Sequence, residues 1–220
     1  MTKRHVAFLD LDGTIIDSAP GIVAGLQEAY KAVGIPAPDE ATLRTWIGPP
    51  IRQTLARELS PHGRDAVEVA NSGFRSYFDA VGARQSTVFA GMAQALEDLA
   101  RNGTVIVVVT HKPRDLAVAS LSQHALAHLV TGLYAPYSPT MLEPKDKLFA
   151  RAIADARPSS ALAAGDRGSD VEAAAAHGIN SVGVTWGFGT AAELSGAGAI
   201  ALAAHPCELP ALLTGDAGGG

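Results

Sequence analysis

HVAFLDLDGT, residues 5–14, is an apolar run that ends in two aspartates and a glycine. A short apolar run closed by polar residues is typical of a buried parallel strand whose carboxyl end leads into a loop. Because Asp10 and Asp12 are separated by one residue, both carboxylates can leave the strand end toward the same pocket. Gly13 allows a tight turn after them. This stretch predicts a strand that delivers two carboxylates to a site.

Similar apolar runs recur along the chain and alternate with segments of helical spacing. Further strands are predicted at residues 105–109, 161–165 and 181–185. Helices are predicted at residues 92–100, 115–124, 147–156 and 170–177. Strands that alternate with helices predict an α/β fold with a doubly wound parallel sheet.

A helical insertion interrupts this alternation after the first strand. No strand-like run occurs between about Gly21 and Arg84, where apolar residues follow helical spacing throughout. We therefore expect an α/β core from residues 1–16 and 85–213, with a small inserted helical domain at residues 17–84. Residues 214–220 lose apolar periodicity and end in glycines, so a flexible tail is expected there.

Composition restricts the class of protein. The chain has 220 residues, of which 47% are hydrophobic and 18% charged, as in an ordinary globular protein. A net charge of -5 without a cluster of basic residues argues against nucleic-acid binding. The apolar runs are too short to cross a membrane, the N-terminus does not resemble a signal peptide, and the single cysteine needs no oxidising compartment. We expect a cytoplasmic protein, monomeric or homodimeric, that acts on a small substrate.

Polar clusters follow the predicted strands, where ligands bind in open α/β sheets. Thr110 and His111 follow the run at 105–109 and precede a helix, a position suited to holding phosphate oxygens. A lysine-containing segment, EPKDK, begins at Glu143 and also precedes a helix. Asp166 and Asp170 follow the third run and can complete a site for a hard metal ion. The four clusters are expected to converge at one edge of the sheet.

DLDGT and the three later clusters, in this order, resemble the four motifs of the haloacid dehalogenase superfamily. The resemblance implies that Asp10 is the nucleophile and Asp12 the general acid/base, and that Thr110 binds phosphate. The third-motif lysine is Lys145 or Lys147, and counting back from the following helix favours Lys145. The insertion resembles the C1 cap of this superfamily, and the core is expected to be Rossmann-like.

The resemblance also implies a magnesium-dependent phosphatase that forms a transient aspartyl phosphate. Mg²⁺ would be held by Asp10, the backbone carbonyl of Asp12 and Asp166, while Asp170 orients a neighbouring group. A carboxylate nucleophile divides phosphoester hydrolysis into two easier steps, and the metal ion cancels charge between nucleophile and substrate. Lys145 would add positive charge where negative charge collects.

The expected substrate is a small phosphorylated metabolite, with phosphoglycolate as the leading candidate. IGPPIR, residues 47–52, resembles a cap loop of phosphoglycolate phosphatases, so Arg52 is assigned to a substrate carboxylate. Thr110, His111 and Gly13 complete the substrate-binding set. Many relatives carry Asn at the position of His111, which we expect to act through its backbone.

Other interpretations of these residues remain open. Alone, an Asp-Leu-Asp pair is usually a solvated turn, Thr110 a helix cap and Lys145 a surface cation. A phosphomutase of the same fold would pass the phosphoryl group to a sugar hydroxyl instead of water. A non-catalytic interaction protein is the third alternative, although a scaffold needs no such set of polar residues together.

Overall fold

The chain forms two compact units in the computed structural model, which describes residues 4–138 and 143–214. One unit combines the residues up to Ile16 with those from Val88 onward, and the other comprises Asp17–Thr87. The chain passes between them through β2 (Ile16–Asp17) and β3 (Thr87–Val88), which form a two-stranded sheet. The tail predicted at residues 214–220 lies outside the described residues beyond Thr214.

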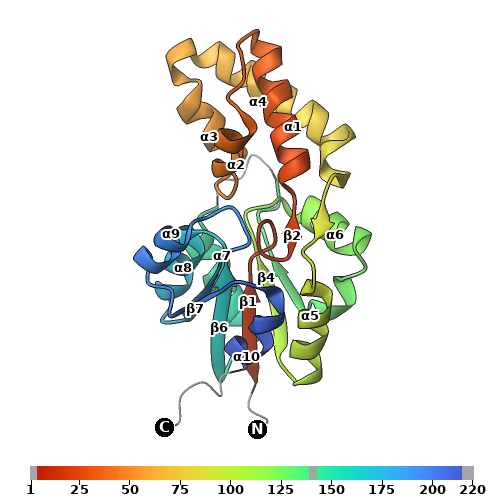
Figure 1. Ribbon diagram of the computed structural model, residues 1–220, viewed down its shortest axis with the longest axis vertical. Coiled ribbons are helices and arrows are strands. Elements are labelled where there is room, and N and C mark those ends of the chain that lie inside the picture. Colours follow the sequence, from red (N-terminus) through yellow and green to blue (C-terminus); the bar gives the residue numbers. More distant parts are fainter. Residues whose placement is uncertain (1–3, 139–142, 215–220) are drawn as a thin grey trace. The chain divides into compact units, whose positions relative to one another are not determined.

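A six-stranded parallel sheet forms the centre of the first unit (Figure 1). In spatial order its strands are β5 (Gly132–Tyr134), β4 (Val105–Val109), β1 (His5–Leu9), β6 (Ser160–Gly165), β7 (Asn180–Val184) and β8 (Ala201–Ala203). The chain moves from β1 outward to β5, returns to β6 and then moves outward on the opposite side. The order therefore reverses beside β1, and ligands bind outside the carboxyl ends of strands at such a point. The predicted doubly wound parallel sheet is confirmed.

The strand register brings the ends of the three central strands to the same level. Leu9 at the end of β1 pairs with Val108 of β4 and with Ala164 of β6. The loops that follow β1, β4 and β6 consequently begin side by side. This register explains how residues more than a hundred positions apart in the sequence reach one site.

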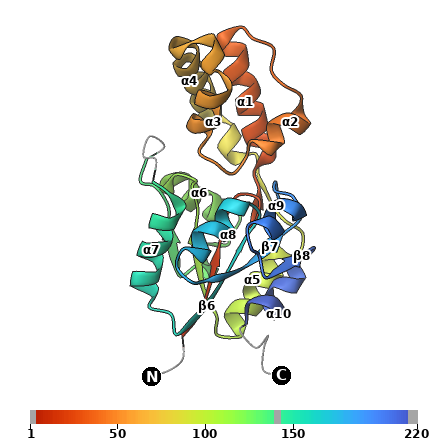
Figure 2. The same ribbon diagram turned by 90° about the vertical axis from the view of Figure 1, so that its left-hand side faces the viewer.

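Helices cover both faces of the sheet. Successive strand residues point to opposite sides, so the apolar strands present side chains on both faces that must be buried. Ala7 and Leu9 pack with α5 (Met92–Arg101), α6 (Arg114–Gln123) and α10 (Leu209–Leu213). Val6 and Phe8 pack on the other face with α7 (Lys145–Ala156) and α8 (Gly168–Ala175), which lie next to each other in Figure 2. A further helix, α9 (Ala191–Gly196), buries Leu194 beside β7 and β8.

The second unit is helical, and it lies in the chain between β2 and β3. Its helices are α1 (Ala19–Val33), α2 (Glu40–Thr45), α3 (Ile51–Glu58) and α4 (Arg64–Ala80). Figure 2 shows α1 and α4 packed along each other. Single turns of 3-10 helix occur in the two units at Ser60–His62, Gly82–Arg84, Ala127–Leu129 and Pro206–Glu208. Among the helices of the described residues, none combines the length and apolar character that a membrane span requires.

The sequence did not predict the two edge strands, the two-stranded sheet of β2 and β3, or the short helices α9 and α10. The predicted helices and central strands appear within a few residues of their expected ends. In contrast, β5 and β8 have three residues each and lie at the two edges of the sheet. Such short strands carry too little apolar periodicity to be recognised locally.

Candidate active site

A buried lysine joins two carboxylates at the carboxyl end of the sheet. Lys145 is the first residue of α7, and its Nζ donates to Asp10 Oδ1 at 2.6 Å and to Asp170 Oδ1 at 2.5 Å. The Lys145 side chain is only 6% exposed. Asp10 follows β1, whereas Asp170 lies in the first turn of α8 and also accepts from the Arg167 N–H. Three elements distant in the sequence therefore meet at one ammonium group.

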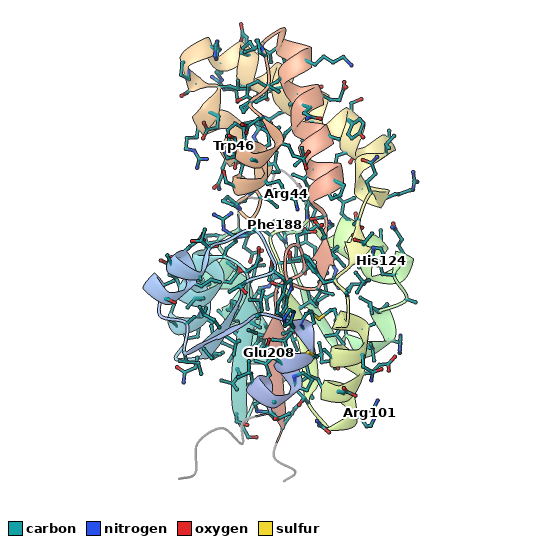
Figure 3. The ribbon with its side chains drawn as sticks, viewed as in Figure 1. Arg44, Trp46, Arg101, His124, Phe188 and Glu208 are labelled. Atoms are coloured by element: carbon teal, nitrogen blue, oxygen red, sulfur yellow. The ribbon has the colours of Figure 1, made fainter. Side chains whose placement is uncertain are left out.

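Asp166 completes a group of three carboxylates. One oxygen each from Asp10, Asp166 and Asp170 lies within 4.8 Å of the others. Asp166 is fully buried, and its Oδ2 accepts from the backbone N–H of Phe188 at 2.8 Å. Figure 3 labels Phe188, which lies on the loop between β7 and α9. Thr14 Oγ1 donates to the other oxygen of Asp166, so both oxygens are oriented by the fold.

Two glycines let the backbone approach the Asp166 carboxylate closely. Gly13 has a φ of +91°, in the left-handed region that favours glycine, and a Cβ there would collide with Asp166 Oδ2. A Cβ on Gly187 would collide with Asp166 Cβ and with the Gly13 carbonyl oxygen. The loops after β1 and β7 can therefore enclose Asp166 only if these positions lack side chains.

Burial determines the electrostatics of these groups. Burial raises the pKa of Asp10 to about 7, with the Asp170 carboxylate adding to the rise and Lys145 opposing it. Burial, followed by the charges of Asp170 and Asp10, also raises the pKa of Asp166 well above its usual range. Burial alone would lower the pKa of Lys145, but the two carboxylates outweigh it and raise that pKa. Burial thus disfavours the charged forms of Asp10 and Asp166, whereas the two carboxylates near Lys145 favour its charged form.

A second ion pair lies beside the first. Lys112 Nζ donates to Asp12 Oδ1 at 2.9 Å, and the Lys112 backbone N–H donates to Thr110 Oγ1 at 3.1 Å. Thr110 itself is buried, and its N–H bonds to the Tyr134 carbonyl at the end of β5. The loops after β1 and β4 are consequently linked by charge.

The charges in this part of the described chain suit a divalent cation. Asp10, Asp12, Asp166 and Asp170 contribute four carboxylates, and Lys112 and Lys145 contribute two ammonium groups. When all are ionised, two negative charges remain uncompensated. Carboxylate oxygens that converge in this way are the ligands of hard metal ions such as Mg²⁺ or Ca²⁺.

A family model described as haloacid dehalogenase-like hydrolase matches residues 7–184. The chain belongs to this family. The matched region begins in β1 and ends with β7, so it contains the carboxylates and lysines of the site, whereas Gly187 and Phe188 follow it. The predicted resemblance to this superfamily, and with it the prediction of a hydrolase, is confirmed.

Relatives and solved structures resemble this haloacid dehalogenase-like hydrolase over most of its length. A phosphoglycolate phosphatase from Pectobacterium atrosepticum is 34% identical over 87% of this chain and 85% of its own. A tyrosine-protein kinase, PtkA of Mycobacterium tuberculosis, is 32% identical over 85% of this chain, which spans 64% of that relative's length. The structure of a predicted phosphatase from Clostridium acetobutylicum superimposes with a TM-score of 0.87 at 29% identity, covering 96% of this chain and 98% of the other.

The structure brings together most of the residues that the sequence singled out in this hydrolase. Asp10, Lys145, Asp166 and Asp170 form the carboxylate and lysine network, and Gly13 lies against Asp166. Asp12 and Thr110 lie at the adjacent loops and both contact Lys112. His111 follows Thr110 and is partly buried.

Two predicted positions have exposed side chains with other partners. Lys147, the alternative third-motif lysine, is 69% exposed, with its Nζ 3.8 Å from Asp146 Oδ2. Arg52 lies in α3 of the helical unit, 40% exposed, and donates to Glu68 Oε1 at 2.8 Å.

Lys112 and the backbone N–H of Phe188 make contacts in the site that the sequence did not predict. Lys112 comes two residues after Thr110, just beyond a strand end. A lysine in that position could have marked it as a candidate site residue. The contribution of Phe188 is a backbone N–H, which every residue except proline carries. No residue type in the sequence could therefore have indicated it.

Proposed function

We propose that this hydrolase is a magnesium-dependent phosphomonoesterase that forms a transient phosphoester on Asp10. The observation that carries the proposal is the position of Asp10. Its carboxylate stands at the end of the central strand, bonded to the Lys145 ammonium and within 4.8 Å of two further buried carboxylates. A carboxylate nucleophile beside a cation and a cluster of hard ligands is suited to phosphoryl transfer.

The residues present fit Mg²⁺. Asp10 and Asp166 would hold the ion together with the main-chain carbonyl of Asp12, and Asp170 would orient Lys145 and Asp10. When bound, the ion would neutralise the repulsion between the anionic nucleophile and an anionic phosphate. The bonds from Thr14 and Phe188 keep the Asp166 carboxylate oriented for this purpose.

In the first step, an Asp10 oxygen attacks phosphorus while Asp12 gives its proton to the leaving oxygen. The phosphorus–oxygen bond to the leaving alcohol breaks as the bond to Asp10 forms. Lys145 neutralises charge at Asp10, and the Thr110 hydroxyl orients the phosphoryl oxygens. In the second step, Asp12 takes a proton from water, the water attacks phosphorus, and phosphate leaves Asp10 as a free carboxylate.

We propose phosphoglycolate as the substrate. The Pectobacterium atrosepticum relative that is 34% identical is named a phosphoglycolate phosphatase. Arg52 would bind the glycolate carboxylate after exchanging Glu68 for it, because a guanidinium pairs with a carboxylate through two parallel hydrogen bonds. In this proposal residues 17–84 form the cap, and residues 1–16 and 85–213 form the catalytic core. The cytoplasmic location and the monomeric or homodimeric state stay predictions.

The similarity to PtkA supplies a second candidate, phosphoryl transfer to a protein tyrosine, since that relative is named a tyrosine-protein kinase. PtkA is longer than this chain, which spans 64% of it, so the comparison supports the kinase candidate less strongly than the phosphatase. A kinase reaction also needs a nucleotide donor, so the two functions separate in an assay.

The deciding experiment measures phosphate release from a panel of metabolite monoesters with and without Mg²⁺. We expect release that depends on Mg²⁺, is greatest with phosphoglycolate and is abolished by Asp10→Asn. Asp79→Asn in α4 serves as a matched control, because Asp79 is an exposed aspartate of the helical unit. No release from any ester by folded protein would refute the phosphatase, and transfer from ATP to a tyrosine peptide would favour the kinase.

A further inference from the structure

Lys112 is a buried cation to which the proposed reaction assigns no step. Its side chain is 4% exposed, and its Nζ lies 2.9 Å from Asp12 Oδ1. Burying an ammonium group is costly unless a carboxylate accompanies it, and removing either partner leaves an uncompensated charge. A pair of this kind at the end of the central strands therefore calls for a functional explanation.

The backbone around both residues is held by hydrogen bonds. The loop that carries Asp12 is closed by bonds from the Gly13 N–H to the Ile16 carbonyl and from the Ile15 N–H to the Leu11 carbonyl. Lys112 is fixed at its own N–H by Thr110 Oγ1. The ammonium group thus reaches Asp12 from a rigid neighbouring loop and restrains the rotation of its carboxyl group.

We propose that Lys112 is a positioning residue for the acid/base Asp12, an inference that rests on the proposed phosphatase reaction. By holding Oδ1, Lys112 leaves Oδ2 of Asp12 to carry the proton toward the leaving oxygen. As that proton departs and the phosphorus–oxygen bond breaks, negative charge develops on the Asp12 carboxyl group. The neighbouring ammonium group stabilises this charge more strongly in the transition state than in the ground state.

If Lys112 positions Asp12, its contribution to the rate should depend on how basic the leaving oxygen is. An alkyl phosphate expels a strongly basic alkoxide and depends on proton donation by Asp12. Para-nitrophenyl phosphate expels a weakly basic phenolate and needs little such help. Loss of Lys112 should therefore harm the alkyl ester more than the aryl ester, whereas general damage to the site would harm both equally.

The experiment compares kcat/KM of Lys112→Met and wild type for phosphoglycolate, or glycerol phosphate if that ester is not turned over, and for para-nitrophenyl phosphate. The value of kcat/KM reports only the steps up to formation of the phosphoester on Asp10. We expect a loss of about 100-fold with the alkyl ester and under about 10-fold with the aryl ester. Lys112→Arg should recover part of the alkyl activity, and Lys31→Met, an exposed lysine paired with Glu28, should behave as wild type.

Two further variants test whether Lys112 acts through Asp12. In an Asp12→Asn background, Lys112→Met should not change the alkyl-to-aryl ratio any further, because its effect passes through Asp12. If Lys112→Met does not fold, Lys112→Gln carries the same comparison. Equal losses with both esters, or an undiminished effect in the Asp12→Asn background, would overturn the inference alone. Absence of phosphate release by wild type from either ester would overturn the proposed function as well.

Discussion

Replacing Lys145 by methionine should greatly destabilise the core, whereas the same change at Lys147 should not. Methionine keeps most of the side-chain length but removes the ammonium that Asp10 and Asp170 share at 2.6 and 2.5 Å. Two buried carboxylates would then face each other without a cation. Removing one partner of a buried ion pair costs about 3–5 kcal/mol, a large part of the stability of an ordinary domain.

Urea denaturation measures this cost. At a slope of about 2 kcal/mol per molar urea, the midpoint of Lys145→Met should fall by about 1.5–2.5 M. The variants are best made in a Trp46→Phe background, so that fluorescence comes from Trp186, whose Nε1 donates to the Thr14 carbonyl beside the site. Trp46 belongs to the other unit, and its removal confines the signal to the core.

Lys147→Met is the matched control. Its exposed side chain contributes little, so the free energy of unfolding should change by less than about 0.5 kcal/mol. Mg²⁺ should raise the midpoint of Lys145→Met more than that of wild type, because the carboxylates have lost their ammonium partner. A midpoint shift in Lys145→Met no larger than that in Lys147→Met would refute the assigned charge network.

Two further substitutions test how the loops around the site are held. Gly13→Ala places a side chain at a φ of +91° and against Asp166, so we expect a loss of at least about 1–2 kcal/mol in urea denaturation. Mg²⁺ affinity, measured by titration calorimetry, should weaken as well, and unchanged affinity would contradict the proposed metal site. Burial alone would raise the pKa of Glu193. Hydrogen bonds from the Gly168 N–H and from Arg167 outweigh burial, so the pKa is lower than its usual value of 4.5. A carboxyl group whose pKa is lower in the folded than in the unfolded state stabilises the fold at pH values above its unfolded pKa, and this stabilisation is lost as the pH falls. Glu193→Gln should therefore lower the free energy of unfolding by about 1 kcal/mol above about pH 5 and by progressively less below about pH 4. A cost that does not vary with pH would show that the charge of Glu193 is not involved.

Local patterns in the sequence determined the type of fold and most of the site. The strands β1, β4, β6 and β7 are buried on both faces, so each leaves a continuous apolar run that can be recognised without its neighbours. Aspartates or a threonine directly after three of these runs marked the carboxyl edge of the sheet. Asp10, Asp12, Thr110 and Asp166 could therefore be selected as candidates from their positions, and the resemblance to the haloacid dehalogenase superfamily supplied their expected roles.

Tertiary structure decided how these residues are paired and which elements complete the sheet. Lys145 and Lys147 are two residues apart on the same helix. Counting back from that helix favoured Lys145, but the packing of α7 shows that Lys145 meets Asp10 while Lys147 faces solvent. The pairing of Asp12 with Lys112 depends on β1 and β4 being neighbours, a strand order that no local pattern encodes. Tertiary structure was likewise needed to identify the edge strands β5 and β8 and the hydrogen bond from the Phe188 N–H to Asp166. Their roles come from partners supplied by distant parts of the chain, which a local sequence pattern does not contain.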